Sequence, residues 1–556
     1  MVDSPIMAPG LAAQFPQIKT YAGMGLDDPT ARLRMDITPQ GFHAQVLTAI
    51  GESWYIDPYY HLEGQTGISY FSDDLGADDV YGLRNGVPVS TPRTYTSTPD
   101  LLPVAQPFSV QGPVALSQGS NLARSGTMLR TYRLAVAADG EYTQFHGGTV
   151  ALGQAAIVTA MNRVNGVYEN EFTIRMVLVA NNNSLVYTNA ATDPYTNNNP
   201  AALLAQNQAN IDTVIGTANY DIGHVFTTGG GGLAGLGVVG DPTRKAQGET
   251  GLPNPTGDAF YIDYVAHEIG HQFGANHTFN TSSDPNRNPS TAYEPGSGST
   301  IMGYAGITGA NSDLQPNSDD YFHSVSFDEV IEFVDNDIPA VGTRTATGNT
   351  VPTVNAGADF VIPAATPFIL TATGADADGD TLTYGWEERD LGPATLLNTP
   401  DNGSSPLFRS FNPTVDPSRT FPKLSDILTN TPTPGEKMFA QSRTSNFRVT
   451  ARDNRVGGGG VNTDDMVLTV VNTGAAFAVT SPNTAVTWAG NTSQTVTWNV
   501  AGTTANGINT ANVRILLSTD GGLTFPTVLL ASTANDGTES ITVPNSRHGS
   551  KAFDVG

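Results

Sequence analysis

The sequence predicts an α+β domain with a twisted mixed sheet, followed by all-β sandwich domains. Between residues 129 and 334, strand-like runs alternate with stretches whose apolar residues recur at helical spacing. After residue 350 helical periodicity disappears, and short alternating runs separated by turn residues continue to the end. A chain of 556 residues is also too long for one domain.

The composition is acidic and lacks cysteine. With 52 acidic against 26 basic residues the formal net charge is -26, which argues against binding nucleic acid or an anionic membrane through bulk charge. The absence of cysteine excludes disulfides, thiolate zinc ligands and a prodomain that inhibits through a cysteine. No apolar run is long enough for a membrane span. Few charges and abundant Gly, Pro, Thr and Asn are typical of an extracellular protein, so we expect secretion with a trimmed leader; a cytosolic enzyme is the alternative.

Residues 1–124 form the first predicted region. Short alternating segments, such as Ala44 to Leu47 and Trp54 to Ile56, predict strands of a small α+β or β-rich unit. The stretch from Ser90 to Gly126 is rich in Pro, Ser and Thr and predicts an exposed linker.

The second region, residues 125–345, alternates predicted strands and helices. Strands are expected at Arg130 to Ala137, Glu171 to Ala180 and Tyr220 to Phe226, and helices at Gly148 to Asn165, Pro200 to Thr217 and Phe260 to Phe273. Ser326 and Glu329 have capping-box spacing and predict the start of a further helix.

The last of those three helices carries the motif HExxHxxGxxH. His267 and His271 are four residues apart, so both imidazoles lie on one face and can share a metal ion. Glu268 follows the first ligand directly and can reach a water on that metal without binding the metal, as a general base must.

Gly274 and His277 complete the motif. Glycine permits the left-handed turn that ends a helix and brings the chain back, so His277 can become the third ligand. Three protein nitrogens with one open position are typical of catalytic Zn²⁺. The alternative is a set of ordinary helix histidines, but composition gives the motif a chance of roughly 2 in 100,000.

The stretch HEIGHQFGANH resembles the metzincin zinc signature, and STIMGY, at Ser299 to Tyr304, resembles the metzincin Met-turn. The wider stretch from Leu129 to Val334 resembles the bacterial reprolysin-like zinc peptidases, although Thr278 replaces the Asp typical of some members. The resemblance implies that Met302 forms an apolar floor under the histidines. It implies for Tyr304 either a part in metal binding and oxyanion stabilisation or simple packing in the turn.

The same resemblance implies the roles of two further segments. Gly229 to Gly240 would include the sheet edge along which an extended peptide binds. Residues 1–124 would be a propeptide that inhibits the enzyme by covering its cleft and is released by cleavage near Arg124.

Two all-β units follow, at residues 350–473 and 476–556, the second expected to be incomplete. Strands are predicted at Phe368 to Ala372, Thr381 to Trp386, Asn446 to Ala451, Met466 to Val471, Thr495 to Val500 and Asn512 to Ser518. The segment DADGDTLTY resembles the Asp-rich turn of bacterial Ig-like repeats. Its Asp376, Asp378 and Asp380 predict either a Ca²⁺ site or a solvated turn.

These observations together predict a secreted zinc metalloendopeptidase, made as a zymogen, that acts on proteins or peptides. One alternative is a surface adhesin whose Ig-like modules bind matrix, with the metal domain incidental. Another keeps zinc hydrolysis but directs it at cell-wall peptides.

Overall fold

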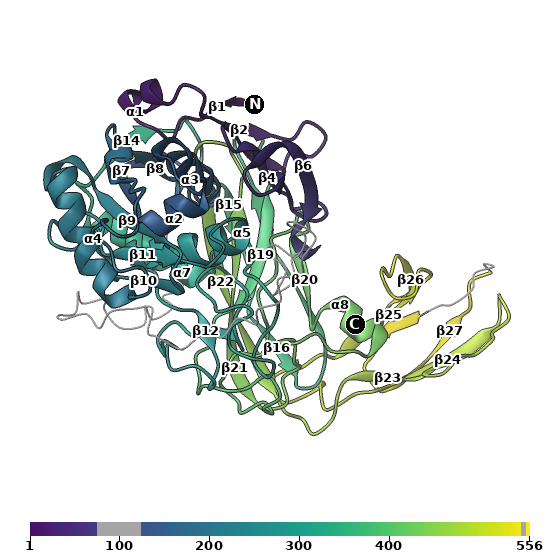
Figure 1. Cartoon of the computed structure of the whole chain (residues 1–556). Helices are drawn as coiled ribbons and strands as arrows, with labels where there is room; N and C mark the ends of the chain where they lie inside the picture. Colours follow the sequence, from purple (N-terminus) through teal and green to yellow (C-terminus); the bar gives the residue numbers. More distant parts are fainter. Residues whose placement is uncertain (75–123, 546–551, 556) are drawn as a thin grey trace.

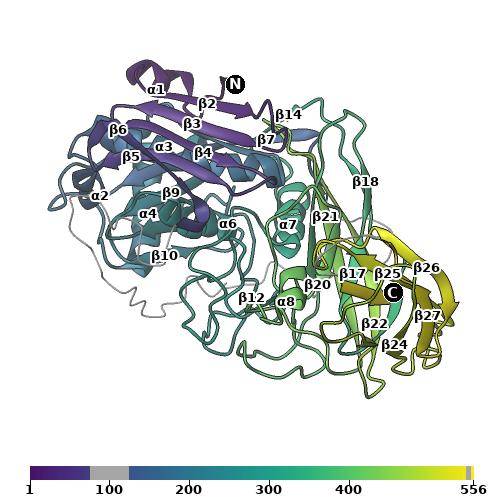
Figure 2. The ribbon, with the colours of Figure 1, turned by 90° about the vertical axis from the view of Figure 1, so that its right-hand side faces the viewer.

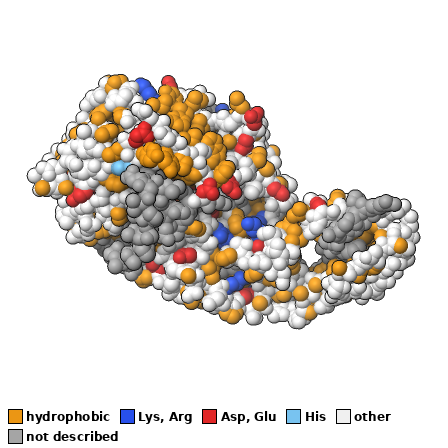
Figure 3. All heavy atoms as spheres, turned by 45° about the vertical axis from the view of Figure 1, so that its right-hand side comes forward, with side chains coloured by type: hydrophobic (Ala, Val, Ile, Leu, Met, Phe, Trp, Pro, Cys, Tyr) orange, Lys and Arg blue, Asp and Glu red, His pale blue; other side chains and the backbone are white. Residues whose placement is uncertain are grey.

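The computed structural model describes residues 1–74, 124–545 and 552–555. An N-terminal sheet, a central α/β region and the first strands after residue 350 pack together, and the last strands extend away from them (Figure 1). In the space-filling view the last strands form an arm that projects from the main body (Figure 3). The predicted linker and cleavage region, Ser90 to Gly126, lies mostly outside the described residues.

The N-terminal sheet is a six-stranded antiparallel meander in which each strand pairs with its neighbour in sequence. Both strands predicted here from alternation lie inside observed strands. The elements are β1 (Val2–Asp3), α1 (Pro9–Gln14), β2 (Lys19–Met24), β3 (Arg32–Thr38), β4 (Gly41–Leu47), β5 (Trp54–Tyr60), β6 (Glu63–Phe71) and η1 (Ser72–Asp74).

The central region is a mixed sheet with helices on both faces. Its strand order is β10-β11-β9-β7-β14, with β8 also paired to β7. The elements are β7 (Met128–Ala138), α2 (Gly140–Phe145), α3 (Val150–Phe172), β8 (Ile174–Leu178), η3 (Asn182–Leu185), α4 (Pro200–Val214), η4 (Thr217–Asn219), β9 (Ile222–Thr227), β10 (Gly231–Ala234), β11 (Gly248–Gly251), α5 (Asp258–Phe260), η5 (Tyr261–Ala266), α6 (His267–Gln272), β12 (Phe279–Asn280), β13 (Glu294–Pro295), α7 (Ser324–Glu332), η6 (Phe333–Asp337) and β14 (Thr343–Ala346).

Alternation along the central strand β7 divides the core between the two faces. Leu134 and Val136 face the core that also contains α3 and the motif helix. Ala135 and Ala137 face the opposite core, against α4. A strand with both faces covered is fully buried, which explains the near-continuous apolar run from residue 134 to 138.

Helix α3 lies between the central sheet and the N-terminal sheet (Figure 2). Its polar side chains are buried because they bond to neighbouring segments: Thr159 donates to Asp36 of β3 at 2.9 Å, and Arg163 pairs with Asp57 of β5 at 2.6 Å and with Asp258 of α5 at 2.8 Å. An unpaired guanidinium would be costly at this depth, so the two carboxylates stabilise the junction of the two sheets.

This packing explains two errors in the predicted boundaries. The helix expected to end at Asn165 continues to Phe172, so the first residues of the strand predicted from Glu171 are helical. Polar residues in its last turns predict solvent, whereas here they are buried against other parts of the chain. Thr173, at φ 55°, ends the helix in the left-handed conformation.

The strands after residue 350 form two units, which we call the first β unit (residues 350–473) and the second β unit (residues 476–555). In the first, the order β16-β22-β21-β19 is accompanied by the pairs β15-β18 and β17-β20; in the second, the orders are β23-β24-β27 and β26-β25-β28. Each unit has its own apolar core. The elements are β15 (Thr353–Asn355), β16 (Phe360–Pro363), β17 (Phe368–Thr371), β18 (Thr373–Ala375), β19 (Thr383–Glu388), β20 (Ser418–Phe421), α8 (Leu424–Thr429), β21 (Arg443–Arg452), β22 (Val461–Val471), β23 (Ala478–Ser481), β24 (Ser493–Asn499), β25 (Asn512–Ser518), β26 (Thr527–Ala534), β27 (Thr538–Thr542) and β28 (Ala552–Val555).

The six strands predicted in these units all correspond to observed strands, with ends that differ by one or two residues in most cases. Within the part of the chain that the structure describes, no helix is both long enough and apolar enough to cross a membrane.

Candidate metal centre

The motif helix changes its winding just before the first histidine. A π-helical segment, η5, runs directly into the α-helix α6, which begins at His267. Such π segments are often found at functional sites. The helix ends as the sequence predicts: Gly274 adopts φ +95°, and its N–H donates to the carbonyl of His271 at 2.9 Å. This turn directs the chain back toward the helix.

The turn brings the three motif histidines together. Potential ligand atoms of His267, His271 and His277 all lie within 4.8 Å of one another, and all three side chains are buried. The ring centroids of His271 and His277 are 4.7 Å apart, and those of His267 and His271 are 4.6 Å apart. The predicted triad is therefore assembled in space.

Each imidazole is oriented by a backbone carbonyl at 2.7 Å from its Nδ1. The acceptor for His267 is Ile301, the acceptor for His271 is Ala275, and the acceptor for His277 is Asn286. A carbonyl only accepts, so each Nδ1 carries the proton and each Nε2 carries the lone pair. This fixes the tautomer in which Nε2 is the metal ligand.

The arrangement of the Nε2 atoms fits a shared cation. Nε2 of His271 and Nε2 of His277 are 3.1 Å apart, and two lone pairs facing each other at this distance repel unless a positive charge lies between them. Zinc–nitrogen bonds of 2.0–2.1 Å in tetrahedral geometry place neighbouring ligand nitrogens about 3.3 Å apart. Three imidazoles leave one tetrahedral position open, so the residues present fit a catalytic zinc ion.

Glu268 lies against the edge strand of the central sheet. Its side chain is buried, and a β-carbon at Gly232 of β10 would overlap the Glu268 carboxylate. Strand β10 pairs with β11 on one side and stands at the end of the strand order. The glycine therefore lets the carboxylate and the sheet edge approach closely.

Met302 packs against the motif helix. It is fully buried, and a β-carbon at Gly270 would be 2.6 Å from its sulfur. The Met302 carbonyl also accepts from the N–H of Thr278 at 3.1 Å, which joins the turn to the residue after the third histidine.

Tyr304 packs beside the triad. Its ring stacks on Phe279 at 4.4 Å and lies 4.7 Å from the ring of His277, while Asn286 Nδ2 donates to its hydroxyl at 3.3 Å. These contacts place the phenol next to the site and describe its packing. The catalytic part that the resemblance implies stays a prediction.

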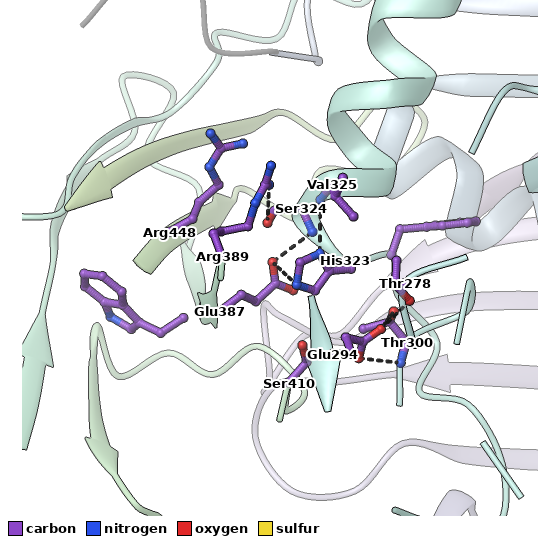
Figure 4. Close-up of polar contacts among 12 residues, drawn as sticks. Thr278, Glu294, Thr300, His323, Ser324, Val325, Glu387, Arg389, Ser410 and Arg448 are labelled. Atoms are coloured by element: carbon purple, nitrogen blue, oxygen red, sulfur yellow. Dashed lines mark hydrogen bonds and ion pairs between the residues drawn. The ribbon is translucent and has the colours of Figure 1, made fainter. Parts of the chain in front are cut away.

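A buried carboxylate that sequence reasoning missed connects the third-histidine segment with the Met-turn. Glu294 is fully buried and accepts from the hydroxyls of Thr278 and Thr300, each at 2.6 Å, and from the N–H of Ser299 at 2.9 Å (Figure 4). Its position in a loop of Asn, Ser, Pro and Gly gave no periodic signal that could have identified it.

Helix α7 supports His277 through its neighbour Asn276. Glu329 accepts from the N–H of Asn276 at 2.9 Å and from its side chain at 2.7 Å, and burial raises the pKa of Glu329 to about 7. The predicted capping box is therefore wrong. The helix begins at Ser324 with His323 as its N-cap, and Glu329 is used for Asn276 instead.

The three aspartates of the first β unit also lie together. Ligand oxygens of Asp376, Asp378 and Asp380 are within 4.8 Å of one another. Arg455 lies 3.1 Å from Asp378 and 3.6 Å from Asp380, so its guanidinium already supplies positive charge to two of the three. Asp376 accepts from the backbone N–H of Asp378 at 2.8 Å, as in an Asx turn.

Fold and site together define a metallopeptidase domain: a mixed sheet, a helix carrying two of three buried histidines, and an adjacent carboxylate. Residues 128–330 match the model of the reprolysin-like metallopeptidases of family M12B. The N-terminal sheet and both β units lie outside the matched residues. No curated protein matches the chain.

Proposed function

We propose that this protein is a zinc-dependent metalloendopeptidase in which His267, His271 and His277 hold zinc and Glu268 is the general base. The observation that carries the proposal is the set of three Nδ1–carbonyl hydrogen bonds, which leave three Nε2 lone pairs directed at one another. The match to a metallopeptidase family supports it.

Zinc, when bound, supplies a Lewis acid that polarises the scissile carbonyl and lowers the pKa of a water molecule. Glu268 then has two tasks. Its carboxylate accepts the proton as water attacks the carbonyl, and it passes that proton to the departing amine. Its neighbours, Ile269 and Gly270, are buried, so the carboxylate works in a site largely shielded from bulk water. Tyr304 is proposed to stabilise the developing oxyanion.

The proposed substrates are proteins or peptides in extended conformation. Such a chain would add to β10 as one more strand, mainly through backbone hydrogen bonds, and this mode accepts many sequences. Gly232 supports the idea because it places Glu268 beside the strand on which the peptide would lie. No observation on the described residues favours the alternative of an adhesin.

The proposal has four further parts. The protein is secreted, it is activated from a zymogen, its two β units have Ig-like folds, and it binds calcium at Asp376, Asp378 and Asp380. The described part of the N-terminal region contacts helix α3 through polar side chains, among them Asp36 and Asp57, which bond to Thr159 and Arg163. It also contributes Ile6, Leu11 and other apolar residues to the core that contains α3. The predicted inhibition is tested by comparing peptidase activity before and after cleavage near Arg124. Calcium binding at the three aspartates is tested by isothermal titration calorimetry.

The direct test is Glu268→Gln in the full chain. It should bind zinc stoichiometrically and, after the same processing, cleave casein at least about 100-fold more slowly than wild type, since a general base contributes typically 10²–10⁴. Wild-type cleavage should stop when a chelator removes the metal. A zinc-loaded Glu268→Gln enzyme with full activity would rule out the mechanism.

A further inference from the structure

The loop that orients His277 is attached to the first β unit by Arg287. The carbonyl of Asn286 accepts from Nδ1 of His277, and Arg287 is the next residue. The Arg287 guanidinium donates to Asn280 Oδ1 at 2.6 Å and to the carbonyl of Gly392 at 2.7 Å. The Arg287 side chain thus connects the two ends of the loop, Asn280 and Arg287, to Gly392, which is more than 100 positions away.

Gly392 is itself held firmly inside the first β unit. A β-carbon there would be 2.5 Å from the backbone nitrogen of Ser405, so the two backbones are in close contact. The Ser405 hydroxyl donates to the carbonyl of Pro393 at 2.7 Å, and Arg443 of β21 donates to the Ser405 carbonyl at 3.0 Å. Arg443 is buried and pairs with Asp390 at 2.7 Å. The acceptor for Arg287 therefore belongs to a rigid part of the β unit.

A second connection reaches the Met-turn. The hydroxyl of Ser299 donates to the carbonyl of Ser410 at 3.2 Å. Ser299 is two residues from Ile301, whose carbonyl orients His267. In Figure 4, Ser410 lies beside the Glu294–Thr300 hydrogen bonds.

A third connection reaches α7. Glu387 accepts from the N–H of Ser324 at 2.8 Å, and Arg389 donates to the Ser324 hydroxyl at 2.9 Å (Figure 4). Arg448 donates to Asp328 at 2.6 Å. The side chains of Glu387, Arg389 and Arg448 are all buried. Buried charges stay where their partners are, because separating them would leave each one unpaired in a poorly solvated place.

We propose that the first β unit is a fixed part of the metal centre's support and that Arg287 is a positioning residue for His277. The inference rests on the proposed zinc peptidase function. Arg287 holds the Asn286 carbonyl where it fixes the tautomer and direction of His277, and it does so by using the β unit as its anchor. The β unit therefore serves the site directly, in contrast to a separable binding module.

The test is Arg287→Met in the full-length protein, which removes the donors and keeps the aliphatic chain. Zinc affinity is measured by competition with a chromophoric chelator, and metal geometry by the visible spectrum of the cobalt-substituted protein. Loss of a partner of a metal-bound histidine costs roughly 10- to 100-fold in metal affinity. We expect a loss in that range, a changed cobalt spectrum and a lower kcat. Arg244→Met is the matched control, since Arg244 pairs with Asp241, three residues away in its own loop.

Unchanged zinc affinity and an unchanged cobalt spectrum in folded Arg287→Met would overturn the inference. If that variant does not fold, Arg287→Lys decides in its place. Lysine carries its three N–H donors on one terminal nitrogen, whereas Arg287 uses two separate nitrogens for its two acceptors, so we expect one of the two bonds to be lost and the affinity to fall by a smaller factor. Wild-type affinity would again overturn the inference. A wild-type protein that binds no zinc would instead refute the proposed function. The two failures are therefore distinguishable.

Discussion

Glu268 of the motif helix and Gly232 of strand β10 are so close that any side chain at position 232 would overlap the carboxylate. The contact joins the proposed general base to the edge of the sheet on which we place the substrate. Position 232 therefore requires glycine because a larger residue would collide with Glu268, and not because of the backbone geometry of the strand.

Gly232→Ala should therefore inactivate the enzyme without removing its metal. The added methyl group displaces the carboxylate, and we expect kcat/KM to fall by roughly 100-fold or more, as for loss of a general base. Zinc content measured by atomic absorption should stay stoichiometric. The control is Gly230→Ala, because a β-carbon at Gly230 would meet no atom within 4 Å. Full activity of Gly232→Ala would contradict the close contact between Gly232 and the Glu268 carboxylate.

Gly270→Ala should push Met302 away from the histidines. The new β-carbon would be 2.6 Å from the Met302 sulfur, and overpacking of this kind costs typically about 1–3 kcal/mol. Thermal unfolding should show the loss of stability, and chelator competition should show weaker zinc binding. The double variant with Met302→Ala should recover part of the loss. Equal destabilisation in the single and double variants would disprove the contact as its cause.

Acid should destabilise the protein partly through His224. This histidine is buried in β9, where its Nδ1 donates to Gln272 Oε1 and its Nε2 accepts from the Thr250 hydroxyl, each at 2.9 Å, and burial lowers its pKa to about 4. The unfolded chain binds a proton near pH 6.5 while the folded chain does not. The contribution of His224 to the free energy of unfolding is therefore fully present above pH 6.5. It is lost as the pH falls toward 4, which lowers that free energy by about 3 kcal/mol.

The measurement is the melting temperature of wild type and His224→Gln between pH 7.5 and pH 4.5. Buried acids such as Glu329, whose pKa is raised to about 7, change stability in the opposite direction and are common to both proteins. The difference between the two curves isolates His224. The difference in melting temperature between wild type and His224→Gln should become smaller or change sign as the pH falls. A difference that is independent of pH would argue against a neutral His224.

Removal of metal should lower the melting temperature of the whole protein. The three Nε2 lone pairs then face one another without a cation, and at free zinc 1,000-fold above Kd the lost binding energy is about 4 kcal/mol. Scanning calorimetry with and without a chelator measures this. His271→Ala should show no such shift, because the site is already incomplete. A chelator effect of equal size in His271→Ala would place the metal elsewhere.

The residues of the site could be found in the sequence because their relation is local. His267 and His271 share a helix face through their spacing, and Gly274 turns the chain so that His277 returns to them; each step spans a few residues. The same locality made most strands and helices predictable. The helix predicted from Ser326 is present but begins two residues earlier, at Ser324, because His323 caps it and Glu329 bonds instead to Asn276, which is distant in sequence.

What orients His267 and His277 was decided only by tertiary structure, whereas the Ala275 carbonyl that orients His271 lies four residues away in the sequence. The carbonyl that directs His267 belongs to Ile301, and the loop that directs His277 is held by Gly392 through Arg287. A backbone carbonyl has no sequence signature, and nothing near Arg287 indicates its distant partner. The sequence by itself determined which side chains can bind a metal. Contacts between distant segments determined the tautomer and direction of His267 and held the loop that orients His277, because such hydrogen bonds form only after the chain has folded.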